Sequence, residues 1–153
     1  MKPIHYLYVG IGLAAVGAAI YLVKSGKMIM PLQGRITSGF GNRVHPVDGT
    51  DDFHNGIDIS GSVGDQIVAP AKGVVKSIYS NSAGGNQLLI EHRNGFTSGY
   101  AHLSKYHVSQ GDFVKKGQVI AEVGSTGKAT GPHLHLTLKD RSGKFVDPIN
   151  HLA

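Results

Sequence analysis

The chain has 153 residues and no cysteine, which excludes a disulfide framework and a cysteine nucleophile. Its 22 glycines and low aromatic content of 7% suit a β-rich domain with many tight turns. The formal net charge is +5, but three of the 15 basic residues flank an apolar N-terminal segment and the other 12 nearly balance the 10 acidic residues, so we expect no nucleic-acid binding.

The first predicted element is a membrane anchor. Tyr6 to Val23 is an uncharged run of 18 residues, flanked by Lys2 and Lys24. As a helix this run would extend about 27 Å, close to the hydrocarbon thickness of a bilayer. We therefore expect residues 1–24 to form a transmembrane anchor that contacts lipid through residues 6–23, followed by a short linker over residues 25–30. The alternative is a cleaved signal peptide.

Residues 31–153 are expected to form one mainly β, antiparallel domain. Turn signals separate short β-type runs, at the 8–12-residue spacing typical of antiparallel all-β proteins. The runs are 57–59, 66–69, 73–79, 87–92, 97–102, 113–114, 119–123 and 133–138. Residues 34–43 alternate turn formers with single apolar residues, and residues 44–52 are expected to be a polar loop. One short helical turn is expected at Leu103 to Tyr106.

Five residues could form a metal site. His133 and His135 are two residues apart in a predicted strand, so their side chains share a face. His54 and Asp58 also return to one face, and His102 follows another predicted strand. Two histidines and a carboxylate can bind zinc and leave one position open to water, which suits amide hydrolysis. From spacing alone, ordinary hydrogen-bonded histidines remain an equal alternative.

The remaining sequence motifs support no other chemistry. We interpret His5, His92, His107 and His151 as surface or hydrogen-bonded residues. The Gly127-Lys128 pair lacks the other residues of a phosphate-binding loop, and no serine lies in a G-x-S-x-G motif.

From Pro31 to its end, the chain resembles the lysostaphin and LytM family of zinc-dependent peptidoglycan endopeptidases. The matching motifs are GFGNRVHP (39–46), HNGIDI (54–59), VAPAKGVV (68–75), GN (85–86), YAHL (100–103), GDFVKKGQ (111–118), GSTG (124–127) and GPHLH (131–135). The resemblance implies an antiparallel β domain with a groove over the metal. It also implies zinc ligands at His54, Asp58 and His135 and catalytic histidines at His102 and His133. Candidates for the substrate groove are Asn42, Arg43 and His45.

The resemblance predicts a zinc endopeptidase that cuts cross-links or stem peptides of bacterial peptidoglycan, and the apolar run predicts that it is membrane-anchored. Because peptidoglycan lies outside the cytoplasm, we expect the domain there, on a bacterial inner membrane or a phage virion membrane. Lys24, Lys27 and Arg35 after the apolar run would favour the opposite orientation by charge alone. The alternatives are a tethered, non-catalytic wall-binding or regulatory module, and a structural membrane protein of a phage particle.

Overall fold

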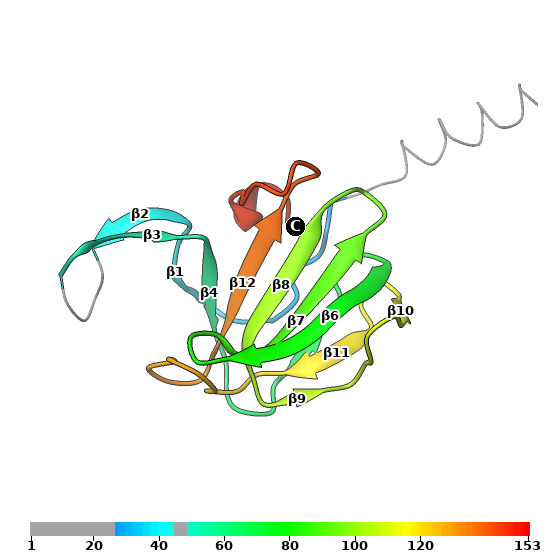
Figure 1. Cartoon of the computed structure of the whole chain (residues 1–153), viewed down its shortest axis with the longest axis horizontal. Helices are drawn as coiled ribbons and strands as arrows, with labels where there is room; N and C mark the ends of the chain where they lie inside the picture. Colours follow the sequence, from blue (N-terminus) through cyan, green and yellow to red (C-terminus); the bar gives the residue numbers. More distant parts are fainter. Residues whose placement is uncertain (1–26, 45–48) are drawn as a thin grey trace, which may run out of the picture.

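The computed structural model describes residues 27–44 and 49–153, which form an antiparallel β structure. Its main sheet has seven strands in the order β1-β4-β12-β8-β7-β6-β10 (Figure 1). In chain order the strands are β1 (Ile36–Ser38), β2 (Gly41–Val44), β3 (Asp51–His54), β4 (Gly56–Ser60), β5 (Gln66–Val68), β6 (Gly73–Asn81), β7 (Gly85–His92), β8 (Thr97–Leu103), β9 (Lys105–Tyr106), β10 (Phe113–Val114), β11 (Val119–Glu122) and β12 (His133–Lys139). The expected mainly β, antiparallel fold class is confirmed.

The central strand β12 shows how the sequence forms two different faces. Leu134, Leu136 and Leu138 are buried, whereas His133 and His135 alternate with them and are half-buried. Because side chains alternate across a strand, the leucines enter the core and the histidines lie on the opposite face of the sheet. The main sheet therefore separates the core from the polar face that carries the candidate site.

A smaller three-stranded sheet, in the order β5-β11-β9, completes the core. Ile67 of β5 and Ile120 of β11 are fully buried and belong to the same apolar cluster as Ile57 and Leu134 of the main sheet. The core thus lies between the two sheets. This packing leaves the other face of the main sheet free for polar side chains.

The β2–β3 hairpin is a separate two-stranded sheet that projects from the domain (Figure 1). The sequence predicted turns and a polar loop over residues 34–52, so β1 and this hairpin correct that prediction. The hairpin pairs Asn42 with Phe53 and Arg43 with Asp52, and its alternation of polar and apolar residues is too irregular to predict strands.

The expected helical turn at Leu103 to Tyr106 is wrong. Lys105 and Tyr106 form β9, in which Tyr106 pairs with Ala121 of β11. Within residues 27–44 and 49–153 the structure has one helix, the short 3₁₀ helix η1 (Pro148–Asn150), capped by the Asp147 side chain.

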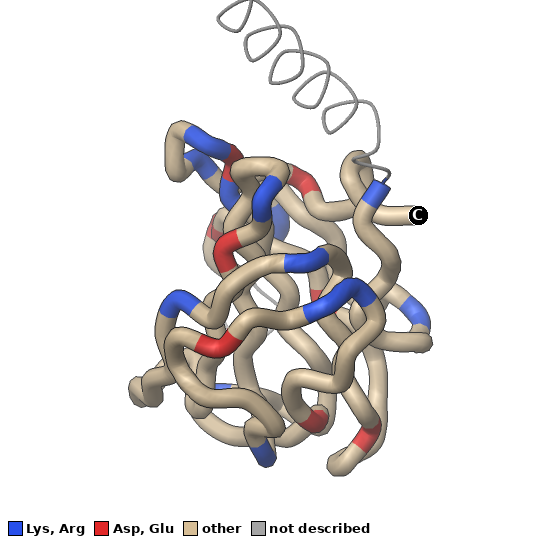
Figure 2. Tube along the Cα trace, turned by 90° about the vertical axis from the view of Figure 1, so that its right-hand side faces the viewer, with Lys and Arg blue, Asp and Glu red and all other residues tan. Residues whose placement is uncertain are grey.

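The first described residues of the chain lie beside its last residues. Met28 is 2% exposed, pairs with Leu152 and packs with the core together with Met30, so residues from the expected linker are part of the fold. The expected anchor, residues 1–24, lies outside the described residues. No helix in the described part of the chain is long and apolar enough to cross a bilayer. Basic and acidic residues are interspersed along this part of the chain (Figure 2).

Candidate metal centre

Three strands bring His54, Asp58 and His135 together. His54 ends β3, Asp58 lies on β4, and the register of β4 with β12 places His135 directly opposite Asp58. The Nε2 atom of His54 lies 3.1 Å from Nδ1 of His135 and 3.3 Å from Oδ1 of Asp58. The third edge of this triangle, from His135 Nδ1 to Asp58 Oδ1, is 2.8 Å.

Each histidine of this triangle has its other ring nitrogen fixed by a hydrogen bond. Nδ1 of His54 donates to the Gly39 carbonyl oxygen at 2.7 Å, and Nε2 of His135 donates to Oδ1 of Asn55 at 3.1 Å. The lone pairs of His54 Nε2 and His135 Nδ1 are therefore directed toward one another. Such outer contacts are typical of metal-binding histidines, because they set the tautomer and the ring orientation.

The three atoms fit a zinc ion. Ligands at 2.0–2.2 Å around a tetrahedral metal lie about 3.3 Å apart, close to the observed separations. Two nitrogen lone pairs and a carboxylate oxygen at such distances would repel without a shared cation or proton. Burial alone would raise the pKa of Asp58. When a proton occupies the place of the cation, hydrogen bonds and positive charge from His135 and His54 outweigh burial and hold this pKa well below its usual range. His54, Asp58 and His135 thus form a group that can bind a metal.

His102 and His133 lie beside this triangle, with their ring centroids 4.7 Å apart. Nδ1 of His133 donates to the Gly131 carbonyl at 2.9 Å, and Nδ1 of His102 donates to the Thr126 carbonyl at 2.7 Å. Each neutral ring therefore keeps the Nε2 lone pair, and Nε2 of His133 is 3.8 Å from Oδ1 of Asp58. Burial, followed by the neighbouring histidines, lowers the pKa of His102 despite its hydrogen bond to Thr126, so the neutral ring is favoured at pH 7.

The backbone at His102 has an unusual conformation. In the described part of the chain, His102 is the one non-glycine residue with a positive φ, at 62°. Its N–H donates to the Gly84 carbonyl at 2.7 Å, while its side chain donates to Thr126. Left-handed backbone costs free energy for such a residue, and it persists because the neighbouring loops hold it.

The groups that hydrogen-bond to the four histidines and the one aspartate of the site were not identified from the sequence as functional. The Gly39, Thr126 and Gly131 contacts use backbone carbonyls, which have no signature in residue type. Asn55 did carry a signal, because an amide side chain follows His54 directly. His92 is buried and hydrogen-bonded to Ser98, His107 contacts Glu122, and the His151 ring packs at a tilt against Phe96. These contacts agree with the interpretation of the three histidines as residues outside the site.

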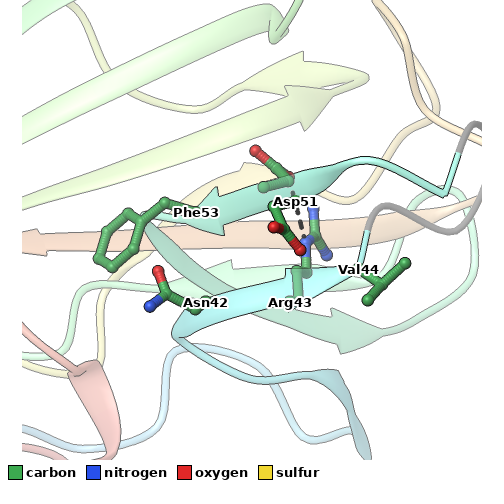
Figure 3. A pocket seen from close by; sticks show the side chains of 6 residues that line it. Asn42, Arg43, Val44, Asp51 and Phe53 are labelled. Atoms are coloured by element: carbon green, nitrogen blue, oxygen red, sulfur yellow. Dashed lines mark hydrogen bonds and ion pairs between the residues drawn. The ribbon is translucent and has the colours of Figure 1, made fainter.

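Two of the groove candidates, Asn42 and Arg43, lie on β2 of the β2–β3 hairpin. Its residues line a surface cavity of about 730 Å³. The lining residues are Asn42, Arg43, Val44, Asp51, Asp52 and Phe53 (Figure 3). Asn42 is exposed, Arg43 is half-buried, and His45 and His5 lie outside the described residues.

Comparisons with known proteins match this arrangement to one family. The sequence model of Peptidase family M23 matches residues 52–148. A DD-carboxypeptidase/endopeptidase Mpg of Neisseria meningitidis serogroup B is 42% identical over 128 residues, covering 83% of this chain and 29% of that protein. The chain therefore spans less than a third of the length of this relative.

Solved structures show the same fold. A zinc-containing peptidase from Vibrio cholerae superposes with a TM-score of 0.75 at 37% identity, over 81% of this chain and 40% of that one. The catalytic domain of the antimicrobial peptidase lysostaphin from Staphylococcus simulans gives a TM-score of 0.70 at 32% identity, over 76% of this chain and 90% of that one. Together with the family match, these likenesses show that the chain belongs to peptidase family M23, the lysostaphin- and LytM-type zinc metallopeptidases.

Proposed function

We propose that this protein is a zinc-dependent endopeptidase that hydrolyses peptide bonds in the cross-links or stem peptides of bacterial peptidoglycan. The observation that carries the proposal is the triangle of His54 Nε2, Asp58 Oδ1 and His135 Nδ1, with separations of 2.8–3.3 Å. Membership of family M23 supports the substrate class, as does a Vibrio cholerae relative named peptidoglycan DD-endopeptidase ShyB, which is 41% identical over 109 residues.

Within this proposal, His54, Asp58 and His135 are the zinc ligands. When bound there, zinc polarises an amide carbonyl and lowers the pKa of a water molecule toward neutrality. The contacts of His54 with Gly39 and of His135 with Asn55 keep both ligand nitrogens aimed at the same point. The ionised state of Asp58 supplies the negative charge that a divalent cation requires.

His102 and His133 handle the protons in the proposed reaction. Their Nδ1 atoms are already engaged as donors, so only Nε2 can accept a proton from the attacking water. The protonated ring can then stabilise the tetrahedral oxyanion or return the proton to the leaving amine. The 4.7 Å separation of the two rings puts both within reach of one reacting group.

The proposal is tested by incubating the detergent-solubilised full chain with purified peptidoglycan and zinc, then separating the released fragments and weighing them by mass spectrometry. We expect fragments with new amino termini, whose masses identify the bond that is cut. Wall binding without any cleaved cross-link or stem peptide would instead indicate a non-catalytic module and would contradict the proposal.

We further propose that residues 1–24 anchor the protein in a bacterial inner membrane or a phage virion membrane, with the domain outside the cytoplasm. The uncharged run over residues 6–23 supports the anchor, and the location of peptidoglycan supports the orientation. Protease added to intact spheroplasts should degrade the domain while a cytoplasmic control protein survives. Full protection of the domain would exclude this orientation.

A further inference from the structure

Arg43 lies on the face of the β2–β3 hairpin that carries His54. The register pairs Arg43 with Asp52, and residues two apart on a strand share a face, so Asp52 and His54 point the same way. The other face carries the exposed side chains of Asn42 and Phe53. Nε of Arg43 donates to Oδ2 of Asp52 at 3.3 Å, which anchors the guanidinium across the hairpin (Figure 3).

The other arm of the same guanidinium reaches the candidate ligands. Its Nη1 donates to Oγ of Ser38 at 2.7 Å, and that hydroxyl lies 3.3 Å from Nδ1 of His54. Nη1 is also 3.9 Å from Oδ2 of Asp58. One planar group therefore connects β1, β2, β3 and β4. A guanidinium suits this task because its donors leave in fixed directions, which the single ammonium of lysine cannot reproduce.

The two carboxylate oxygens of Asp58 have different surroundings. Oδ1 faces the imidazole nitrogens of His135 and His54, at 2.8 and 3.3 Å. Oδ2 faces Arg43, whose side chain is 29% exposed, and Asp58 is 17% exposed. A positive charge on one side of a carboxylate favours the rotamer in which the opposite oxygen points away from it.

We infer that Arg43 is a positioning residue: it holds Oδ2 of Asp58 so that Oδ1 alone joins the ligand set, and it ties the hairpin to that set. This inference rests on the zinc site of the proposed function. It changes the role expected for Arg43, which the sequence suggested as a groove residue. Its neighbours explain the change, because the negative charges of Asp52 and Asp58 offset the attraction that the guanidinium would exert on an acidic substrate group.

The test compares zinc affinity in four variants of the full chain, measured by competition with a chromogenic chelator. The Arg43→Met variant removes all donors while keeping a long side chain, and we expect its zinc dissociation constant to rise about 10- to 100-fold, as for other residues that orient metal ligands. Arg43→Lys keeps the charge and should recover only part of the affinity. The matched control, Arg35→Met, removes an exposed arginine next to β1 and should bind zinc like the parent.

Asp52→Asn provides an independent variant in case Arg43→Met fails to fold, which circular dichroism of the zinc-free chains would reveal. It weakens the anchor of the guanidinium without touching Asp58, and we expect a several-fold loss of zinc affinity. Unchanged affinity in the folded Arg43 variants, or in Asp52→Asn, would overturn the inference. Full recovery by Arg43→Lys would also overturn it, since charge alone would then suffice.

Activity separates positioning from substrate binding. A positioning residue predicts that Arg43→Met keeps the parental KM and that excess zinc restores its kcat, whereas a substrate-binding arginine predicts a raised KM with parental zinc affinity. Failure of this inference can also be told apart from failure of the proposed function. A parent chain that binds zinc but cuts no peptidoglycan contradicts the peptidase and leaves the affinity comparison intact, whereas a parent that binds no zinc contradicts the metal site itself.

Discussion

His133 and His135 share one face of β12 but present opposite ring nitrogens to the site. His135 donates from Nε2 to Asn55 and keeps Nδ1 free, at 2.8 Å from Oδ1 of Asp58. His133 donates from Nδ1 to Gly131 and keeps Nε2 free, at 3.8 Å from the same oxygen. The two histidines are thus separated by their hydrogen-bond partners as well as by position. This difference supports distinct roles, metal ligand for His135 and proton transfer for His133.

The division of roles predicts opposite effects of two alanine substitutions. His133→Ala should keep zinc at the parental level but lower the rate of peptidoglycan cleavage by about 10²-fold or more, because a general base is lost. His135→Ala should lose most of its zinc, because one of three protein ligands is missing. Zinc analysis after gel filtration, together with initial rates, checks both. Equal zinc loss in the two variants would contradict the division.

At the scale of elements, the end of β8 depends on two loops that pack against it. The side chain of Thr126 accepts from the Asn86 N–H at 3.0 Å and donates to the Leu103 carbonyl at 2.9 Å, while its carbonyl holds the His102 ring. Gly85 has a φ of 61° and lies against Thr126 so closely that a Cβ would collide with its side chain and backbone. The left-handed conformation of His102 therefore relies on the close approach of these loops.

Gly85→Ala should destabilise the packing of these loops through two effects, the strained backbone at residue 85 and the collision of the added Cβ with Thr126. We expect the free energy of unfolding to fall by about 1–3 kcal/mol, from the strained φ and the collision together. Cleavage activity should fall more than tenfold at a temperature at which the variant stays folded, because His102 shifts. Gly143→Ala is the matched control: its φ is 82°, but nothing lies within 4 Å of the added Cβ. Equal losses of stability and activity in the two variants would show that the collision has no effect.

The same elements show what the sequence can predict. Strands β4 and β12 were predicted because apolar residues alternate with polar ones in their sequences. The structure buries those apolar residues, and the register of the two strands brings Asp58 opposite His135. The β2–β3 hairpin was missed because it has no regular buried face, so its strands depend on pairing with each other. β9 was mistaken for a helical turn because a two-residue strand is too short to show a period.

The sequence predicted which residue types form the site, but not the groups that orient their side chains. Side chains that can bind zinc stand out at any spacing, whereas the carbonyls that orient them belong to residues of every type. The positive φ of His102 depends on contacts with loops that are distant in the sequence. The positioning role that we propose for Arg43 likewise depends on the hairpin register, which places Arg43 beside Asp52 and near Asp58.

At the scale of the whole molecule, a second polar group lies within the fold, away from the candidate zinc ligands. His92 of β7 is 3% exposed, its Nε2 is 2.7 Å from Oγ of Ser98, and that hydroxyl is 2.7 Å from the Tyr100 hydroxyl. Nδ1 of His92 lies 3.3 Å from the Lys72 carbonyl. Burial lowers the pKa of His92, although its hydrogen bonds to backbone carbonyls oppose the shift. The folded protein therefore resists protonation of a histidine that the unfolded chain protonates readily.

This difference makes stability depend on pH in a defined direction. Above its ordinary pKa of 6.5, His92 is neutral in both states and has no effect on the pH dependence. As the pH falls below that value, the unfolded chain binds a proton that the folded protein excludes, so the free energy of unfolding falls by up to about 1.4 kcal/mol per pH unit until His92 protonates in the folded state. His92→Gln removes the titration while keeping a polar group near Ser98. Urea unfolding at pH 7.5 and 5.5 should show a smaller acid-induced loss in this variant than in the parent. Titration of the zinc site occurs in both proteins and cancels from the comparison, so equal losses would mean that His92 is not the group that senses pH.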